Sequence, residues 1–257
     1  MDLVESNFNI TQRHPWELSR SSIVTELIQR FVKSDRKKQI LDVGSGDAYV
    51  ADGFTRALNA ECKCLDIGYT SDSMQKIGAL YNNPDLSLYE ALSQVSPKKE
   101  MDVVTLLDVI EHVPDDAALI NEIISSGLVG KETYVLITVP AYQSLFSHHD
   151  ALLKHYRRYD MKLLRNTTDK CGLEIIYGGY FFMSLIPPRL LQVIKEKLSP
   201  KSEEELQHLG NWEKSEWLTK TIQTILLTDY KIGELFRKLR IHIPGLSCFA
   251  VCKLKPT

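Results

Sequence analysis

Short apolar runs alternate with amphipathic stretches through the first half of the chain. The runs have the length of strands and few polar interruptions, as in parallel strands that are buried on both faces of a sheet. The stretches between them follow a helical rhythm, which is typical of helices that pack on such a sheet. This alternation predicts an α/β fold with a doubly wound, mostly parallel sheet. The predicted strands of this half are residues 40–43, 61–67, 86–90, 101–108 and 132–139.

The second half departs from this alternation. A helix is predicted over 161–170, with Gly172 marking its end, and strands are predicted over 173–182 and 246–254. The segment between these two strands is too long for a plain connection, and it contains helical patterns over 189–198 and 217–240. We therefore predict three parts: an N-terminal helical lid or anchor (1–36), a core (37–183 plus 245–257) and a helical insertion that caps the core (184–244).

Composition and charge narrow the classes of partner. Lys+Arg 31 against Asp+Glu 33 gives a net charge of −2, which argues against a nucleic-acid-binding protein. The five cysteines form no C-x-x-C pair and no apolar leader precedes the acidic start, so we expect a cytoplasmic protein with reduced thiols. Nothing in the sequence specifies an oligomeric state.

The predicted helix over 217–240 combines an apolar face with basic residues towards its end. Such a helix either caps its own domain or lies on a membrane surface, so peripheral membrane contact through residues 184–244 is a second expectation for the insertion. The basic residues are Lys231, Arg237, Lys238 and Arg240.

The stretch 39–50, Q-I-L-D-V-G-S-G-D-A-Y-V, joins the first strand to a helix expected over 47–58. Glycines at such a turn let the backbone approach a ligand beside the unpaired N–H groups of the helix N-terminus. A dinucleotide fingerprint would need a third glycine where Tyr49 stands, and no G-K-[ST] triplet of a phosphate loop follows. The remaining D-x-G-x-G pattern, at Asp42, Gly44 and Gly46, resembles the first motif of class I S-adenosylmethionine-dependent methyltransferases. The third small residue that is usual in this family is Ala48 here.

Two more stretches support this resemblance. The second strand ends at Asp66, twenty residues after Gly46, where nucleotide-binding α/β folds place an acid that accepts hydrogen bonds from ribose hydroxyls. The string D-V-I-E-H-V-P-D, residues 108–115, resembles the loop after the fourth strand of small-molecule methyltransferases, including O-methyltransferases of quinone biosynthesis. Methyltransferases that act on exocyclic amines of nucleic acids typically carry an Asp/Asn-Pro-Pro-Tyr motif in this loop, and it is absent here.

The resemblance implies a seven-stranded sheet with an antiparallel last strand. It also implies S-adenosylmethionine as the cofactor and S-adenosylhomocysteine as its product. The expected cofactor-binding residues are Asp42, Gly44, Ser45 and Gly46 at the methionine end, Asp66 with its neighbour Ile67 at the ribose, Glu90 and Ala91 beside the adenine, and Asp108 and Val109 beneath the sulfonium.

A polar segment rich in histidine, residues 141–159, follows the fifth strand. It lies beyond the carboxyl end of a central strand, where open α/β sheets place their ligands. Its H-D-x-x-x-x-H-x-R-R-Y string is similar to that of a bacterial subgroup of these methyltransferases. We interpret the segment as a substrate loop, the alternative being an exposed polar loop without a ligand. The expected substrate-binding residues are His148, Tyr156, Arg157, Arg158 and Tyr159, together with Arg13 and Trp16, whose alternative role is to anchor the N-terminus.

Histidines of this region are the candidates for a general base. His149 is the first candidate, His155 the second and His112 the third. We expect no metal site from His148, His149 and Asp150 together with His155, because the adjacent His148 and His149 point apart on a strand or helix and no second pair of ligands is evident.

The predicted reaction is methyl transfer from S-adenosylmethionine to a small, lipid-linked or carrier-linked acceptor, most simply at a hydroxyl group. The cofactor supplies an activated methyl group, and the protein aligns the acceptor with it and excludes water. Two alternatives stay open at this point. One is an NAD-dependent oxidoreductase on the same fold, and the other is a membrane-peripheral binding module that retains a vestigial cofactor site.

Overall fold

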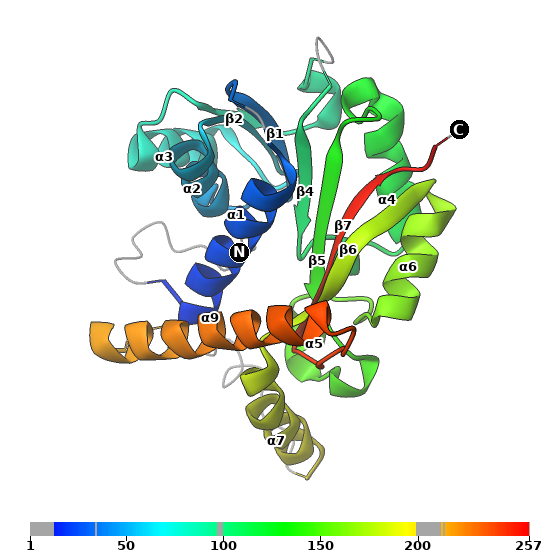
Figure 1. Cartoon of the computed structure of the whole chain (residues 1–257). Coiled ribbons are helices and arrows are strands. Elements are labelled where there is room, and N and C mark those ends of the chain that lie inside the picture. The colour runs from blue at the N-terminus through cyan, green and yellow to red at the C-terminus, as the bar shows by residue number, and fades with distance from the viewer. Residues whose placement is uncertain (1–12, 34, 97–99, 199–211, 213, 257) are drawn as a thin grey trace.

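A single seven-stranded sheet forms the centre of the molecule (Figure 1). The computed structural model describes residues 13–33, 35–96, 100–198, 212 and 214–256. The strands are β1 (Lys38–Val43), β2 (Ala60–Leu65), β3 (Leu86–Tyr89), β4 (Val103–Leu107), β5 (Tyr134–Pro140), β6 (Leu173–Phe181) and β7 (Ser247–Leu254). They lie in the order β3-β2-β1-β4-β5-β7-β6, and β7 is antiparallel to both of its neighbours. The predicted doubly wound fold with an antiparallel last strand is therefore confirmed.

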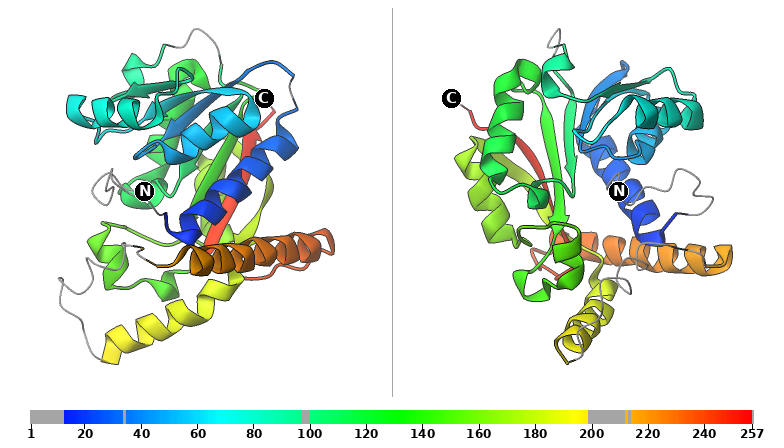
Figure 2. Two further views of the ribbon diagram at one scale, coloured as in Figure 1. Left: turned by 90° about the vertical axis from the view of Figure 1, so that its left-hand side faces the viewer. Right: turned by 180° about the vertical axis from the view of Figure 1, so that it is seen from behind.

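Helices cover both faces of the sheet, as the two further views show (Figure 2). The helices are α1 (Pro15–Phe31), α2 (Tyr49–Leu58), α3 (Ser71–Tyr81), α4 (Asp116–Ile123), α5 (His148–Leu152), α6 (Met161–Lys170), α7 (Ile186–Leu198) and α9 (Glu216–Lys238). On one face, Ile23 of α1, Phe54 of α2 and Ile77 of α3 join one buried cluster with the strands. On the other face, Ile120 of α4 and Leu164 of α6 join a second cluster.

Two helices differ from the sequence expectation in instructive ways. Helix α1 begins at Pro15, well before the apolar stripe that starts at Ile23. Pro15 suits a first helical position, and the His14 ring accepts a hydrogen bond from the Trp16 amide at 3.1 Å. Helix α3 was not predicted separately, since Ile77 is its one buried residue and leaves little apolar pattern. The Thr70–Ser73 capping box was the available signal for its start.

The insertion approaches the core through both of its described helices. Helix α9 lies beside α1 in all three views (Figures 1 and 2), and its Leu226 and Tyr230 are buried in the α1 cluster. Helix α7 projects from the end of the sheet that carries the loops after β5 (Figure 1). The residues between the two predicted helices of the insertion, 199–216, fall largely outside the described residues. Among the helices that the structure describes, none combines the length and apolar character that crossing a membrane requires.

Candidate functional site

The turn between β1 and α2 takes a conformation that suits glycine. Gly44 and Gly46 have φ angles of 67° and 55°, in the left-handed region that L side chains rarely adopt. A Cβ atom on Gly44 would lie 2.6 Å from Cγ2 of Val109, which follows β4. The Gly44 amide donates to the Leu65 carbonyl at 2.7 Å, so the turn is tied to the end of β2. This turn, Gly44–Gly46, is the glycine corner. It lies between the carboxyl ends of β1, β2 and β4.

Asp66 reaches this corner, as expected from the spacing. Its carboxylate accepts from the Gly46 amide at 2.9 Å and from the Gly68 amide at 2.8 Å. The side chain is partly exposed, and the adjacent Ile67 is 93% exposed, which is unusual for a large apolar residue. A partly exposed carboxylate and an open apolar side chain therefore stand together at the edge where α/β sheets bind nucleotides.

Asp42 and Asp108 lie deeper and hold neighbouring strands together. Asp42 is buried and accepts from the Thr105 hydroxyl of β4 at 2.6 Å, while burial raises its pKa to about 6. Asp108 has a φ of 56° and accepts from the Thr138 hydroxyl of β5 at 3.2 Å. Both predicted cofactor residues are therefore fixed by the sheet at its carboxyl edge.

Two arginines join helix α1 and the residues just before its first turn to the carboxyl edge of the sheet. Arg13 donates to Asp47 at 2.5 Å and to Glu17 at 2.8 Å. Arg20 is buried, forms an ion pair with Asp108 and has its guanidinium carbon 4.4 Å from the centre of the Trp16 ring. Sequence reasoning placed Arg13 and Trp16 at the site but missed Arg20. Its signal was an arginine within the apolar stripe of an amphipathic helix.

The other predicted cofactor residues, Glu90, Ala91 and Ser45, form hydrogen bonds with nearby side chains. The amides of Glu90 and Ala91 both donate to the Gln94 side chain, at 2.9 and 3.2 Å, and Glu90 is exposed. Ser45 is buried, and its hydroxyl lies 2.8 Å from the Tyr69 hydroxyl. The loop after β3 is next to Asp66, because the Asp66 amide donates to the Tyr89 carbonyl at 3.1 Å.

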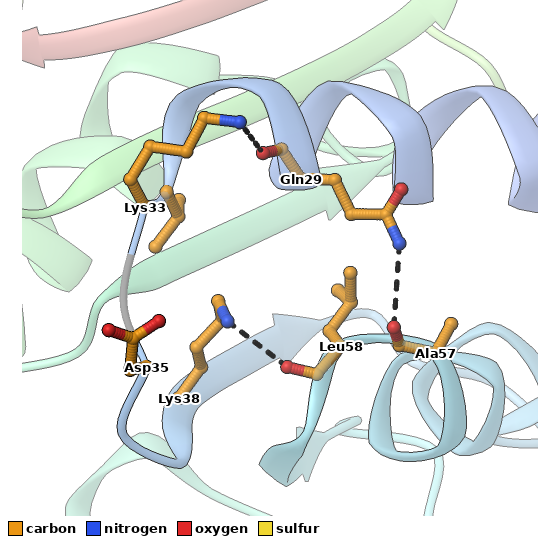
Figure 3. A pocket seen from close by; sticks show the side chains of 7 residues that line it. Gln29, Lys33, Asp35, Lys38, Ala57 and Leu58 are labelled. Carbon is orange, nitrogen blue, oxygen red and sulfur yellow. Dashed lines mark hydrogen bonds between the residues drawn. The ribbon is translucent and has the colours of Figure 1, made fainter.

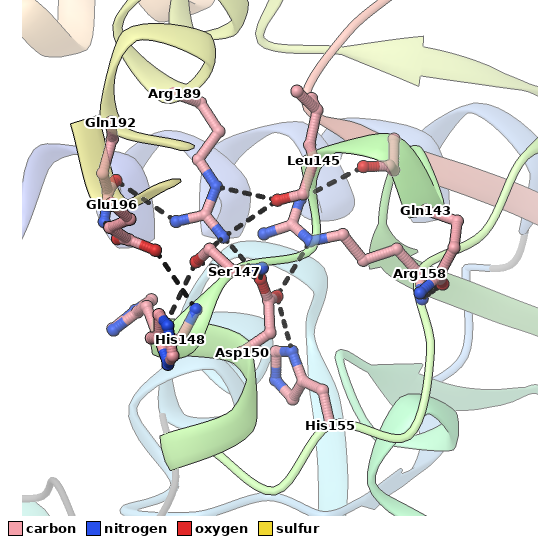
Figure 4. A network of polar contacts seen from close by, with 12 residues as sticks. Gln143, Leu145, Ser147, His148, Asp150, His155, Arg158, Arg189, Gln192 and Glu196 are labelled. Carbon is pink, nitrogen blue, oxygen red and sulfur yellow. Dashed lines mark hydrogen bonds and ion pairs between the residues drawn. The ribbon is translucent and has the colours of Figure 1, made fainter. Parts of the chain in front are cut away.

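Asp150 is the centre of the histidine-rich segment, a role the sequence did not indicate (Figure 4). Its carboxylate contacts His155 Nδ1 at 3.0 Å, Arg158 Nε at 2.8 Å and Arg189 Nη2 at 2.5 Å, and it accepts from the Ser147 amide at 2.8 Å. Burial alone would raise the pKa of Asp150, but His155 and the two arginines hold that pKa well below its usual range. Arg189 lies on α7, so the insertion is joined to this segment.

Three of the five predicted substrate-binding residues in this segment form hydrogen bonds with other parts of the protein. Arg158 is buried on Asp150, and the Tyr159 hydroxyl, fully buried, donates to Asp116 at 2.8 Å. Arg157 donates to the Pro114 carbonyl at 2.5 Å. His148 and Tyr156 are exposed. The segment is thus an ordered loop in which the side chains of His148 and Tyr156 are exposed, while Arg157, Arg158 and Tyr159 contact the rest of the fold.

The three candidate bases occupy different surroundings. Burial and the neighbouring Arg189 lower the pKa of His149, which keeps its imidazole neutral near pH 7. His155 and His112 meet edge to face, with ring centres 4.5 Å apart. Glu111, next to His112, is fully buried, and burial followed by the charge of Asp108 raises its pKa well above the usual range. Glu111, His112 and His155 are the described residues that could share a metal ion.

A cavity of about 440 Å³ lies elsewhere, between α1 and the start of β1 (Figure 3). It is at the amino edge of the sheet, whereas ligands of open α/β sheets bind at the carboxyl edge. We therefore assign it no part in the candidate site. Its lining residues are Gln29, Val32, Lys33, Asp35, Lys38, Ala57 and Leu58.

The family model of the methyltransferase domain matches residues 16–176, more than half of the chain. The chain belongs to the methyltransferase domain family. Membership confirms the predicted resemblance to the class I S-adenosylmethionine-dependent methyltransferases. The ubiquinone biosynthesis O-methyltransferase of Neisseria meningitidis serogroup C is 34% identical over 91 residues, which are 34% of this chain and 38% of that relative. The chain therefore matches well under two thirds of the length of this relative.

Solved structures with low sequence identity share the fold. The phosphoethanolamine N-methyltransferase 2 of Haemonchus contortus, in complex with phosphomonomethylethanolamine and S-adenosylhomocysteine, has a TM-score of 0.54 at 15% identity. That match covers 94% of this chain and 53% of the other. The [4+2]-cyclase SpnF has a TM-score of 0.57 at 12% identity, covering 98% of this chain and 85% of the other. Because one of these neighbours is named a cyclase, the acceptor chemistry must be argued from the site and not from the fold.

Proposed function

We propose that this protein transfers a methyl group from S-adenosylmethionine to a hydroxyl oxygen of a small or lipid-linked acceptor. The observation that carries the proposal is the contact of Asp66 with the glycine corner, beside the open Ile67 side chain. A carboxylate there offers acceptors to both hydroxyls of a ribose, and the corner brings backbone N–H groups to the other end of the donor. Oxygen as the methylated atom is supported by the partial likeness to ubiquinone biosynthesis O-methyltransferases.

In this reaction the protein's own groups would orient the donor, align the acceptor and take up the hydroxyl proton. S-adenosylmethionine brings an activated methyl group. The corner and Asp66 would orient the donor, and the loop at 141–159 would bring the acceptor oxygen in line with the methyl group. His155, held by Asp150, and the neutral His149 are both able to take the hydroxyl proton.

Replacing Asp66 by alanine is expected to weaken S-adenosylhomocysteine binding. Hydrogen bonds to a charged group contribute about 1.5–3 kcal/mol, so the dissociation constant should rise by roughly tenfold to a hundredfold. Isothermal titration calorimetry of the full chain measures it. The matched control is Asp72→Ala, at an exposed ion pair on α3, which should bind as the wild type does. The proposal fails if the wild type binds NAD and not S-adenosylhomocysteine.

A second proposal concerns how a lipid-linked acceptor would reach the site. Helix α7 turns Arg189 and Glu196 towards the histidine-rich segment and leaves an apolar stripe in solvent. Lys195 and Lys197 flank that stripe, which suits an anionic membrane surface. The exposed apolar residues of α7 are Leu190, Leu191, Ile194 and Leu198.

The basic end of α9 is less suitable for this contact than its sequence indicated. Arg237 has a side chain only 10% exposed and is paired with Glu234 at 2.6 Å, while Lys231 is paired with Glu26 at 2.5 Å. We therefore assign the membrane contact to α7 and not to the end of α9.

The double variant Leu191→Ser/Leu198→Ser is expected to float several-fold less with vesicles of phosphatidylcholine and phosphatidylglycerol than the wild type does. Removing two exposed leucines takes away apolar area that would enter the lipid interface, while the buried face of α7 stays intact. Leu80→Ser, at an exposed leucine of α3, is the control and should float as the wild type does. Equal flotation of all three proteins, or none, would contradict the membrane contact and leave the methyltransferase proposal untouched.

A further inference from the structure

Glu111 has a buried carboxylate that no hydrogen bond from the described residues satisfies. It lies in the short 3-10 turn Ile110–His112 after β4, its side chain is 0% exposed, and neither carboxylate oxygen has a hydrogen-bond partner. A buried carboxylate without a partner is costly, and such groups are normally paired or bind a metal. Asp108 differs in this respect, because Arg20 and Thr138 already contact its carboxylate.

Two histidines converge on this carboxylate from different loops. His112 is the next residue in the chain, and His155 comes from the loop after β5, which lies beside β4 in the sheet. Their rings meet at 84° with centres 4.5 Å apart. One ligand atom from each of Glu111, His112 and His155 lies within 4.8 Å of the others. Three groups of the kinds that ligate metals therefore lie close enough together to share one ion.

A contact between His155 Nδ1 and the Asp150 carboxylate fixes the orientation of the His155 ring. Asp150 contacts its Nδ1 at 3.0 Å, and Asp150 is in turn held by Arg158 and Arg189 (Figure 4). Histidines that bind metals usually donate their other ring N–H to a carboxylate in this manner, which fixes the tautomer and leaves Nε2 as the ligand atom. The arrangement behind His155 is therefore that of a supported ligand.

We propose that Glu111, His112 and His155 bind one divalent transition-metal cation. Two imidazoles and one carboxylate suit Zn²⁺, Mn²⁺ or Co²⁺ better than Mg²⁺ or Ca²⁺, which prefer oxygen ligands. Three protein ligands leave coordination positions for other groups. The sequence pattern argued against a metal held by His148, His149, Asp150 and His155, and of these four residues the proposed site uses His155 alone as a ligand.

The chemical use of the cation rests on the proposed function. An acceptor hydroxyl bound to the cation loses its proton to water more easily, because the cation stabilises the alkoxide or phenolate. The oxygen then forms a bond to the methyl carbon, the carbon–sulfur bond breaks, and its electron pair stays on sulfur as S-adenosylhomocysteine leaves. The cation is neither oxidised nor reduced. His155 would serve as a ligand in this arrangement, and no protein base would be required.

The test is titration of the metal-stripped full chain with ZnCl₂ or MnCl₂ alone, followed by calorimetry. We expect one equivalent to bind the wild type, and at least a tenfold weaker binding by the nearly isosteric Glu111→Gln and by His155→Gln. His242→Gln, at an exposed histidine between α9 and β7, is the control and should bind as the wild type does. Circular dichroism of each variant confirms that it is folded.

Two results would overturn the proposal: no binding of Zn²⁺ or Mn²⁺ by the wild type, or binding by Glu111→Gln as tight as that of the wild type. A Co²⁺ titration gives an independent reading, since visible absorption bands should appear with the wild type and be absent with Glu111→Gln. S-adenosylhomocysteine titration of the same samples separates this inference from the proposed function. Donor binding without metal binding would refute only the metal site, and metal binding without donor binding would refute only the methyltransferase.

Discussion

Replacing Asp150 by alanine should lower the free energy of unfolding by about 3–5 kcal/mol, the effect expected when one partner of a buried ion pair is removed. Arg158 and Arg189 have side chains only 7% exposed, and each would be left beside the other without the carboxylate that compensates both. Chemical denaturation in urea at pH 7, followed by circular dichroism, measures the loss. Asp72→Ala, which removes an exposed carboxylate, should stay within about 0.5 kcal/mol of the wild type.

Asp150→Asn separates charge from shape at this position. The amide retains the size of the side chain and can still accept hydrogen bonds, so the loss should be smaller than with alanine. A loss below about 1 kcal/mol with alanine would mean that solvent reaches the arginines, and Asp150 would then not organise the loop. In both variants His155 loses the carboxylate charge behind its Nδ1, and with alanine it loses the hydrogen bond as well, so the metal affinity of the folded protein should fall, more with alanine than with asparagine.

The stability that Asp150 provides should depend on pH in a defined direction. Its pKa in the folded protein is below its unfolded value of about 3.9, so the folded state favours the ionised form. The contribution is complete above that unfolded value and is lost as the pH falls towards the lower, folded value. Asp42 acts in the opposite direction between about pH 4 and 6, because burial raises its folded pKa to about 6. The difference between the wild type and Asp150→Asn therefore isolates Asp150.

Local patterns in the sequence predicted the parts of this protein that local physics determines. Strands buried on both faces carry near-continuous apolar runs, and the turn at Gly44 and Gly46 needs residues that tolerate a positive φ. The spacing to Asp66 follows from the length of one helix and one strand, and the structure brings Asp66 to the Gly46 amide at 2.9 Å. The fold class could therefore be predicted from these patterns, and the family resemblance added the antiparallel last strand, which the structure confirms.

The contacts that close the site join residues far apart in the chain. Arg20 meets Asp108 across 88 positions, Arg13 meets Asp47 across 34, and Arg189 meets Asp150 across 39. A single sequence shows that such residues are charged, but it does not show which of them pair. The same limit applies to Glu111, since its place in the loop was evident while its burial without a partner was not.

Gly44→Ala should both destabilise the protein and remove donor binding. A residue with a side chain at a φ of 67° costs about 1–2 kcal/mol, and the new Cβ would in addition meet Val109 at 2.6 Å. Either the corner opens or Val109 moves, and both change the place where the donor's methionine end would lie. We expect S-adenosylhomocysteine affinity to fall by more than tenfold, as measured by calorimetry on the folded variant.

Two further variants distinguish the cost of the positive φ at position 44 from the clash with Val109. Gly78→Ala, in the middle of α3 with no atom within 4 Å of the new Cβ, should stabilise the protein by about 0.5–1 kcal/mol and leave donor binding unchanged. The double variant Gly44→Ala/Val109→Ala removes the clash and keeps the unfavourable φ. If the clash dominates, the double variant recovers part of the donor affinity, and its loss is smaller than the sum of the losses in the two single variants. Unchanged donor affinity in Gly44→Ala would contradict the placement of the donor at this corner, because the corner could not then lie against it.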